Sequence, residues 1–248
     1  MESANRVGRP DPGLRWLVLA PALGLLLSCA GDDVGDGGGA TTEVLAAEAA
    51  VVPLPEPSPA GETSLEEALG QRRSGREYTA EPLTLAELGQ LLWAAQGVTS
   101  DEGGRTAPSA GARYPLELFA VIRDVEDIDP GVWRYEPEEH ALSPVGGGDR
   151  TAALQAASLG QPPVGDAPVG VVIAGVQERT EVEYGERSER YVILEAGHAA
   201  QNLVLQATTL DLASVTIGAF DDAEVQRVLG LGEDEDPLYV IPVGRPAG

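Results

Sequence analysis

Lysine is absent from this sequence of 248 residues, so all 16 of its basic residues are arginines. The absence excludes a lysine Schiff base, a pyridoxal phosphate linkage and the lysine of a Walker A phosphate loop. A single cysteine, Cys29, rules out an internal disulfide and a zinc site built from two or four cysteines. With only two histidines, His140 and His198, a multi-histidine metal centre is excluded as well, and we expect no metal site.

Aromatic residues make up only 4% of the chain, so the core has to consist mainly of Leu, Val, Ile and Ala. The formal net charge is −24, and such an acidic body repels the phosphate backbone of nucleic acids. We therefore expect no nucleic-acid partner. The acidic residues are dispersed along the chain, which is typical of a solvated surface and indicates solubility more than function.

The first 28 residues are typical of an export signal. Basic residues lead into an apolar run from Leu14 to Leu27 that is too short for a comfortable membrane span. The run ends in L-L-S-C, which resembles a bacterial lipobox, a signal whose cleavage leaves the cysteine N-terminal and lipidated. We predict a lipoprotein signal peptide over residues 1–28 and an exported protein held on the membrane only through lipid at Cys29. An ordinary signal peptide with a chance cysteine, and a cytoplasmic enzyme with a misplaced start, are the alternatives.

Residues 29–63 are rich in Gly, Ala, Pro and acidic residues, which predicts a disordered tether. The folded domain is then expected over residues 64–248, which is long enough for one core. Two capping-box patterns, Ser64 with Glu67 and Thr84 with Glu87, predict helix starts. A long helix is predicted over 190–210 and a short one after Asp221, and strands over 116–123, 132–135, 169–174, 213–217 and 238–243.

Helices and strands alternate without the regular spacing of βαβ units, and no G-x-G-x-x-G follows the first strand. The pattern predicts an α+β fold, with a mixed β-sheet sandwiched by helices, rather than a Rossmann fold.

Three guanidinium groups and a hydroxyl fall within the five residues Arg72-Arg73-Ser74-Gly75-Arg76. Such clustering is costly in so acidic a chain unless an anion is bound, and arginine suits bidentate contacts with phosphate. The alternative is a helix C-terminus that favours cations. A loop of small residues, Ala107 to Pro115, would let the backbone approach a flat ligand closely, or it is a plain connection.

Six motifs in order are similar to those of the nitroreductase superfamily: R-R-S-x-R, W-A-A-Q-G, A-P-S-A-G-A-R-Y-P, L-E-A-G-H-A-A-Q-N, I-G-A-F and I-P-V-G-R-P. The resemblance covers roughly residues 64–246, essentially the whole folded part. The third and fourth resemble the SagB/ThcOx-type (McbC-like) dehydrogenase branch in particular. The resemblance implies a homodimer with the long helix at its interface and one FMN per subunit in clefts between the subunits.

The resemblance also implies roles for individual positions. The FMN phosphate and ribityl chain would be held by Arg72, Arg73, Ser74 and Arg76, and closed in by Gly244 and Arg245. The isoalloxazine would be approached by Pro108, Ser109 and Ala110 from the other subunit. Backbone contacts near its reactive edge would come from Gly218 and Ala219, where N–H groups tune a cofactor that does the hydride chemistry itself.

Azoline dehydrogenases of this branch are expected to carry a catalytic Lys-Tyr pair where this sequence has Arg190-Tyr191. Arginine is a poor general base because it stays protonated, so azoline oxidation in particular is not indicated, while Tyr191 remains a candidate acid or base. Gln96 either frames the flavin ring or lies on the surface. The polar residues of the long helix, His198, Gln201 and Asn202, form either a structural network or a substrate contact.

The sequence therefore predicts an FMN-dependent oxidoreductase that transfers hydride by a ping-pong mechanism to or from a small or peptide-derived substrate. The alternative is a catalytically silent surface lipoprotein of the same fold that binds flavin or another ligand.

Overall fold

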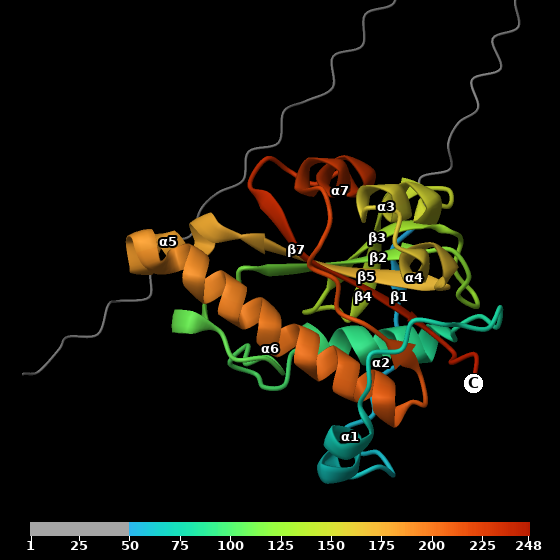
Figure 1. Ribbon diagram of the computed structural model, residues 1–248. Helices are drawn as coiled ribbons and strands as arrows, with labels where there is room; N and C mark the ends of the chain where they lie inside the picture. Colours follow the sequence, from blue (N-terminus) through green and yellow to red (C-terminus); the bar gives the residue numbers. More distant parts are fainter. Residues whose placement is uncertain (1–49) are drawn as a thin grey trace, which may run out of the picture. The chain divides into compact units, whose positions relative to one another are not determined.

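The computed structural model describes residues 50–248, while the predicted signal peptide, Cys29 and most of the predicted tether lie outside the described residues. One sheet has the strand order β1-β4-β3-β2-β5-β7-β6 (Figure 1). Its strands are β1 (Val52–Pro53), β2 (Leu116–Ile122), β3 (Gly131–Glu136), β4 (Ala141–Gly147), β5 (Val169–Val176), β6 (Ala213–Ser214) and β7 (Glu235–Gly244). The helices are α1 (Leu65–Gln71), α2 (Leu85–Gln96), η1 (Ala110–Ala112), α3 (Thr151–Ala157), α4 (Pro162–Asp166), α5 (Gln177–Tyr184), η2 (Gly185–Arg187), α6 (Ser188–Thr209) and α7 (Asp222–Leu229).

All pairings between the named strands are antiparallel. The α+β class is confirmed, but the expected mixture of strand directions is limited to isolated parallel bridges, such as the one between Ser74 and Ser214. For β2, β3 and β4 the reason lies in the connections, because these strands follow one another without an intervening helix, as antiparallel neighbours do.

Helices cover both faces of the sheet (Figure 1). Along β2, Leu118 and Ala120 pack with residues of α2 and α6, whereas Phe119 and Val121 pack with residues of α3, α4 and α7. This alternation is the two-residue period of a strand. Strand β5 is buried along its whole length because it is covered from both sides.

Both predicted capping boxes are present. The Ser64 hydroxyl accepts the Glu67 N–H at 3.2 Å, and the Thr84 hydroxyl accepts the Glu87 N–H at 3.2 Å. Each glutamate carboxylate accepts the N–H of its capping residue in return. The long helix is confirmed as α6, with 22 residues. Neither α6 nor any other helix within residues 50–248 is long and apolar enough to cross a membrane.

Two predicted boundaries need correction. Val52 pairs with Leu142 and the side chain of Leu54 is buried, so the folded part begins before Ser64 and takes in the last residues of the predicted tether, 29–63. Of the strand predicted over 213–217, only β6 (Ala213–Ser214) is paired as a strand of the sheet. Ile217 forms an isolated bridge to Val240. Both differences arise from pairing with residues far away in the sequence.

A methyl group at Gly244 is expected to destabilise the fold. A Cβ atom there would lie 2.7 Å from Cδ of Pro168 and 2.9 Å from Cδ1 of Tyr78. Overpacking of this kind costs about 1–3 kcal/mol, so urea unfolding of Gly244→Ala should show a lower midpoint than the wild type. Gly146→Ala is the matched control, because its Cβ would meet nothing within 4 Å. Equal midpoints for the two variants would contradict the prediction.

Candidate functional site

The arginine-rich segment after α1 lies beside the C-terminal strand. Ser74 bridges Ser214 of β6, and the Gly75 N–H donates to the Ser214 carbonyl at 3.0 Å. Strand β6 pairs in turn with the end of β7, at Val243 and Gly244. Since neighbouring strands lie about 4.8 Å apart, the backbone of Ser74 is roughly 10 Å from β7. The predicted approach of segments from opposite ends of the domain is therefore present in the backbone.

Further hydrogen bonds tie these two segments together. The Thr79 N–H donates to the Arg245 carbonyl at 2.9 Å. The Tyr78 hydroxyl lies 3.2 Å from the Gly75 carbonyl and 3.3 Å from the Pro242 carbonyl. Burial raises the pKa of Tyr78 well above its ordinary value, which keeps the hydroxyl a proton donor to these carbonyls.

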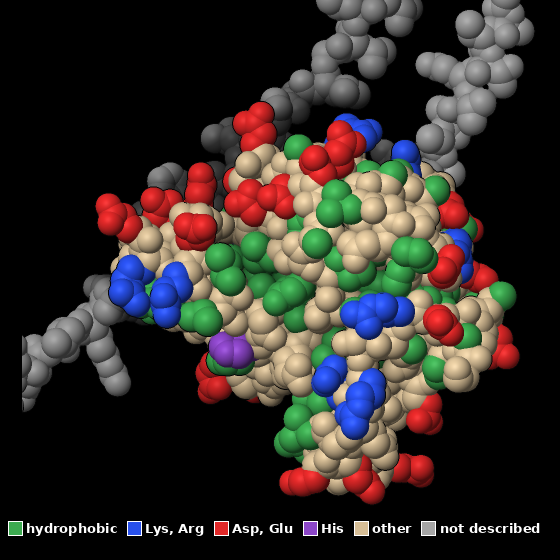
Figure 2. Space-filling model, in the orientation of Figure 1, with side chains coloured by type: hydrophobic (Ala, Val, Ile, Leu, Met, Phe, Trp, Pro, Cys, Tyr) green, Lys and Arg blue, Asp and Glu red, His purple; other side chains and the backbone are tan. Residues whose placement is uncertain are grey.

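The side chains of Arg72, Arg73 and Arg76 are not neutralised by carboxylates. Arg73 and Arg76 are exposed and Arg72 is half-buried. Within residues 50–248 none of the three forms an ion pair, and Arg73 donates instead to the carbonyls of Gly70 and Arg72. Basic side chains gather close to α1 in Figure 2. In a chain with 40 acidic residues, this stretch of surface is suited to an anion such as a phosphate.

Arg245 differs from these arginines. Its Nη2 lies 3.0 Å from both carboxylate oxygens of Glu87, and its Nε lies 3.6 Å from Glu81. The backbone of Arg245 follows the end of β7, and its guanidinium group is paired with the glutamate that caps α2. Contact between Arg245 and a phosphate therefore requires an exchange of partners.

Gly218 and Ala219 form an exposed turn after the bridge at Ile217. In the described part of the chain, neither of their N–H groups donates a hydrogen bond. A Cβ atom at Gly218 would meet only a ring carbon of Tyr239, at 4.0 Å. The turn thus offers two free backbone donors in open space, an arrangement that suits the acceptor atoms of a ligand edge.

The loop with Pro108, Ser109 and Ala110 lies elsewhere in the chain. It packs against α5, where Arg113 donates to Glu183 at 3.0 Å and 2.9 Å. Figure 1 shows this loop beside the N-terminal half of α6, whereas the segment after α1 lies near its C-terminal end. Within one subunit, the structure therefore does not bring these three residues to Arg72 and its neighbours.

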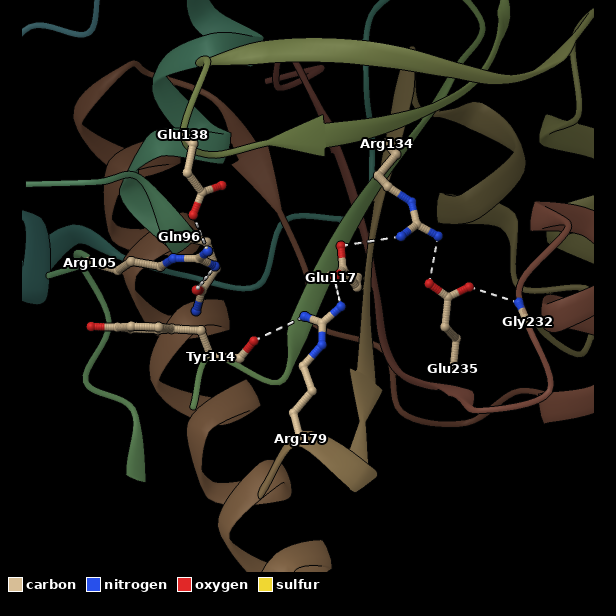
Figure 3. A network of polar contacts seen from close by, with 9 residues as sticks. All are labelled: Gln96, Arg105, Tyr114, Glu117, Arg134, Glu138, Arg179, Gly232 and Glu235. Atoms are coloured by element: carbon tan, nitrogen blue, oxygen red, sulfur yellow. Dashed lines mark hydrogen bonds and ion pairs between the residues drawn. The ribbon is translucent and has the colours of Figure 1, made fainter. Parts of the chain in front are cut away.

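Gln96 is fully buried, so the interpretation of this residue as a surface glutamine is wrong. Its Oε1 accepts from Arg105 at 3.2 Å, which fixes the orientation of the amide (Figure 3). No residue of the described chain accepts a hydrogen bond from its Nε2. Arg105 also donates to Glu138 at 2.8 Å, and its guanidinium lies 4.6 Å from the ring centroid of Tyr114.

Arg179 extends this network on the other side of Tyr114, as Figure 3 shows. It donates to the Tyr114 carbonyl at 3.1 Å and pairs with Glu117 of β2. The end of the loop, at Tyr114, is thus held by two arginines. Arg105 contacts the ring of Tyr114, and Arg179 contacts its backbone carbonyl.

Glu195 is a candidate site residue that the sequence interpretation missed. It lies on α6 with only 3% of its surface exposed. Burial raises the pKa of its carboxyl group to about 7, although the Ser109 hydroxyl, the Ala110 N–H and Arg105 each lower it. Its Oε1 has no hydrogen-bond partner among residues 50–248. The available signal was a charged residue within the apolar stripe of a helix, inside L-E-A-G-H.

Tyr191 lies at the start of α6, where its hydroxyl accepts from Arg187 at 2.9 Å and its ring packs edge-on against Tyr184. Arg190 is exposed and lines a shallow cavity of about 410 Å³ with Ile193 and Leu194.

The three polar residues further along α6 differ in their surroundings. His198 and Gln201 are exposed. Asn202 donates to the Thr106 carbonyl at 3.1 Å, which favours a structural role for this residue.

Comparison with known proteins places these features in context. A sequence model of the nitroreductase family matches residues 69–245. A protein of Methanocaldococcus jannaschii that carries the name nitroreductase is 46% identical over 184 residues, which cover 74% of this chain and 92% of that protein. A crystal structure from Ralstonia eutropha JMP134, also named a nitroreductase, superposes with a TM-score of 0.70 at 30% identity, covering 82% of this chain and 92% of the other. The microcin synthetase McbBCD complex of E. coli, solved with truncated pro-MccB17 bound, contains a chain that superposes with a TM-score of 0.64 at 26% identity, covering 72% and 70% of the two chains.

Proposed function

Because the chain belongs to the nitroreductase family, we propose that it is an FMN-dependent oxidoreductase with a ping-pong mechanism. The observation that carries the proposal is the convergence of the Arg72–Arg76 segment on the C-terminal strand, with three guanidinium groups that pair with no described carboxylate. Bound FMN supplies the hydride chemistry, so the task of the chain is to hold the cofactor, orient it and recognise the substrate.

The phosphate and ribityl chain are assigned to Arg72, Arg73, Ser74 and Arg76. Arginine forks match the geometry of phosphate oxygens, and charge-assisted hydrogen bonds are the strong ones. Gly244 lets the backbone of β7 pass close to Tyr78 and Pro168, and Arg245 joins the site when it releases Glu87. The free N–H groups of Gly218 and Ala219 are assigned to the reactive edge of the ring.

The ring site is completed by a second copy of the chain in this proposal. Pro108, Ser109 and Ala110 lie away from the arginine segment of their own subunit, so they reach a flavin held by the other subunit. The side chains of Ile193 and Leu194 on α6 are 52% and 50% exposed. Adjacent exposed apolar residues of this size mark a surface for association, which supports a homodimer formed along α6.

The substrate is proposed to be a small molecule or a modified peptide, as in the SagB/ThcOx-type branch. The likeness to the microcin synthetase complex supports the peptide option. Tyr191 is assigned as the proton donor or acceptor, oriented by Arg187. Arg190 stays protonated, so it attracts and orients anionic groups of the substrate.

Lipid anchoring through Cys29 and export stay predictions from the sequence, because those residues lie outside the described part of the chain.

The colour of the purified domain tests the proposed function. Protein comprising residues 50–248 should be yellow, with an FMN spectrum that bleaches with dithionite and recovers in air. Reduction by a nicotinamide or quinol donor would show turnover. Yellow protein that accepts electrons from no such donor would instead favour the flavin-binding alternative. Colourless protein that ignores added FMN would contradict both.

A further inference from the structure

We propose that Glu195 is a positioning residue that fixes the Ser109–Tyr114 turn in the shape it presents to the flavin. The inference rests on the proposed function, which places Ser109 and Ala110 against the isoalloxazine. Glu195 itself is buried on α6, so it acts through the turn and does not touch the cofactor directly.

The hydrogen bonds of Ser109 show how Glu195 reaches both ends of the turn. The Ser109 hydroxyl oxygen accepts the Tyr114 N–H at 2.8 Å. The hydroxyl hydrogen is therefore the one left to donate, and the Glu195 carboxyl group faces it together with the Ala110 N–H. An ionised carboxylate beside both groups attracts them, which links the turn to a 22-residue helix.

The backbone of the turn needs such an anchor. Gly111, Ala112 and Tyr114 have φ angles of 60°, 51° and 46°. For the two residues other than glycine, this left-handed conformation is strained, and it persists only where the surroundings enforce it. The ring and carbonyl of Tyr114 are held by Arg105 and Arg179, and Glu195 provides the corresponding hold at Ser109.

The charge of the Glu195 carboxyl group decides how strongly it holds the Ser109–Tyr114 turn. Arg105 is the charged group that acts on it. The other charged groups nearby pair with each other: Glu117 with Arg179, and Arg113 with Glu183. On α6 itself, the titratable residues Tyr191 and His198 lie about one helical turn from Glu195. Protonation removes acceptor capacity from the carboxyl group. Because burial raises its pKa to about 7, the anchor weakens as the pH falls through neutrality.

The test uses the full-length holoprotein and the variants Glu195→Gln and Glu195→Ala. The dissociation constant of FMN and the values of kcat and KM are measured between pH 5.5 and 8.5. Wild-type FMN affinity should decline below about pH 7, with an inflection near the pKa of the buried carboxyl group. Because the FMN phosphate itself titrates near pH 6, every variant should lose some affinity at low pH. Glu195→Gln should lack the additional decline near pH 7 and stay near the wild-type affinity at high pH, since an amide oxygen still accepts. Glu195→Ala should bind FMN about tenfold more weakly or worse, the effect of one lost hydrogen bond to a charged group.

The exposed Glu181 of α5 provides the control, and Glu181→Gln should keep the wild-type pH profile. A pH profile of Glu195→Gln that matches the wild-type profile would overturn the proposal, and so would wild-type affinity in a folded Glu195→Ala. If Glu195→Ala does not fold, the pH dependence of FMN affinity in Glu195→Gln alone tests the proposal. Failure of the wild type to bind FMN would defeat the proposed function instead, so the two failures are distinguishable.

Discussion

Replacing Arg72 and Arg245 together by alanine is expected to lower FMN affinity by roughly two to four orders of magnitude. Hydrogen bonds to charged groups contribute about 1.5–3 kcal/mol each, and about 1.4 kcal/mol corresponds to a factor of ten in affinity. Titration of the apoprotein with FMN, followed by quenching of flavin fluorescence, measures the loss. Unchanged flavin affinity in the double variant would defeat the phosphate assignment.

The pairing of Arg245 with Glu87 sharpens this experiment. Arg245→Ala removes the proposed phosphate contact and also leaves the Glu87 carboxylate without its guanidinium partner. An unpaired carboxylate close to a phosphate is repulsive. Adding Glu87→Gln to Arg245→Ala should therefore restore part of the affinity. Arg227→Ala is the control, because Arg227 is exposed and pairs with Glu224 on α7.

The second large effect concerns stability and pH. Glu195→Gln is expected to remove a pH-dependent loss of stability on the order of 3–4 kcal/mol, at about 1.4 kcal/mol for each pH unit between 4.5 and about 7. Burial raises the pKa of Glu195 from 4.5 to about 7, so between these values the folded chain binds more protons than the unfolded chain. The contribution of Glu195 to stability is therefore fully present below about pH 4.5 and is lost as the pH rises through about 7.

Urea unfolding at pH 5 and pH 8 tests this expectation. The free energy of unfolding of the wild type should fall more between the two pH values than that of Glu195→Gln. The comparison between variants matters because the other carboxylates of this acidic chain contribute equally to both. Glu181→Gln should match the wild type. If the glutamine variant shows the same fall as the wild type, Glu195 is not the titrating group.

Taken together, these expectations give Glu195 two opposed effects. Its ionised form costs stability, yet that form is the one that anchors the Ser109–Tyr114 turn. Perturbed carboxyl groups of this kind cluster at functional sites, which is consistent with the position of Glu195 beside the loop assigned to the flavin.

Local sequence signals predicted much of the fold. The capping boxes at Ser64 and Thr84 and the apolar run of β5 depend on neighbours in the chain, and the structure confirms them. Strand β1 escaped prediction because two residues, one of them Pro53, become a strand only through pairing with β4. The short helices α3 to α5 carry no side-chain N-cap hydrogen bond that the sequence would reveal.

In the candidate site, too, some features could be predicted from the sequence and others depend on contacts between distant residues. The motifs suggested an approach of the Arg72–Arg76 segment to the end of β7, and in the structure the two flank strand β6. They did not reveal that Arg245 pairs with Glu87, a residue 158 positions away. Side-chain partners across such distances depend on the assembled core. The burial of Glu195, by contrast, had a local signal in the apolar stripe of its helix.

The strand order has a practical consequence for attaching anything to this domain. β1 and β6 are opposite edges of the sheet, about 29 Å apart at six inter-strand spacings of about 4.8 Å. A purification tag or surface linker fused ahead of Val52 would emerge far from the arginine segment. The same tag after Gly248 would begin beside it, since the Ala247 N–H donates to the Glu77 carbonyl at 3.1 Å. Immobilisation through the N-terminal end of the domain should therefore leave ligand entry open, whereas immobilisation through its C-terminus should obstruct it.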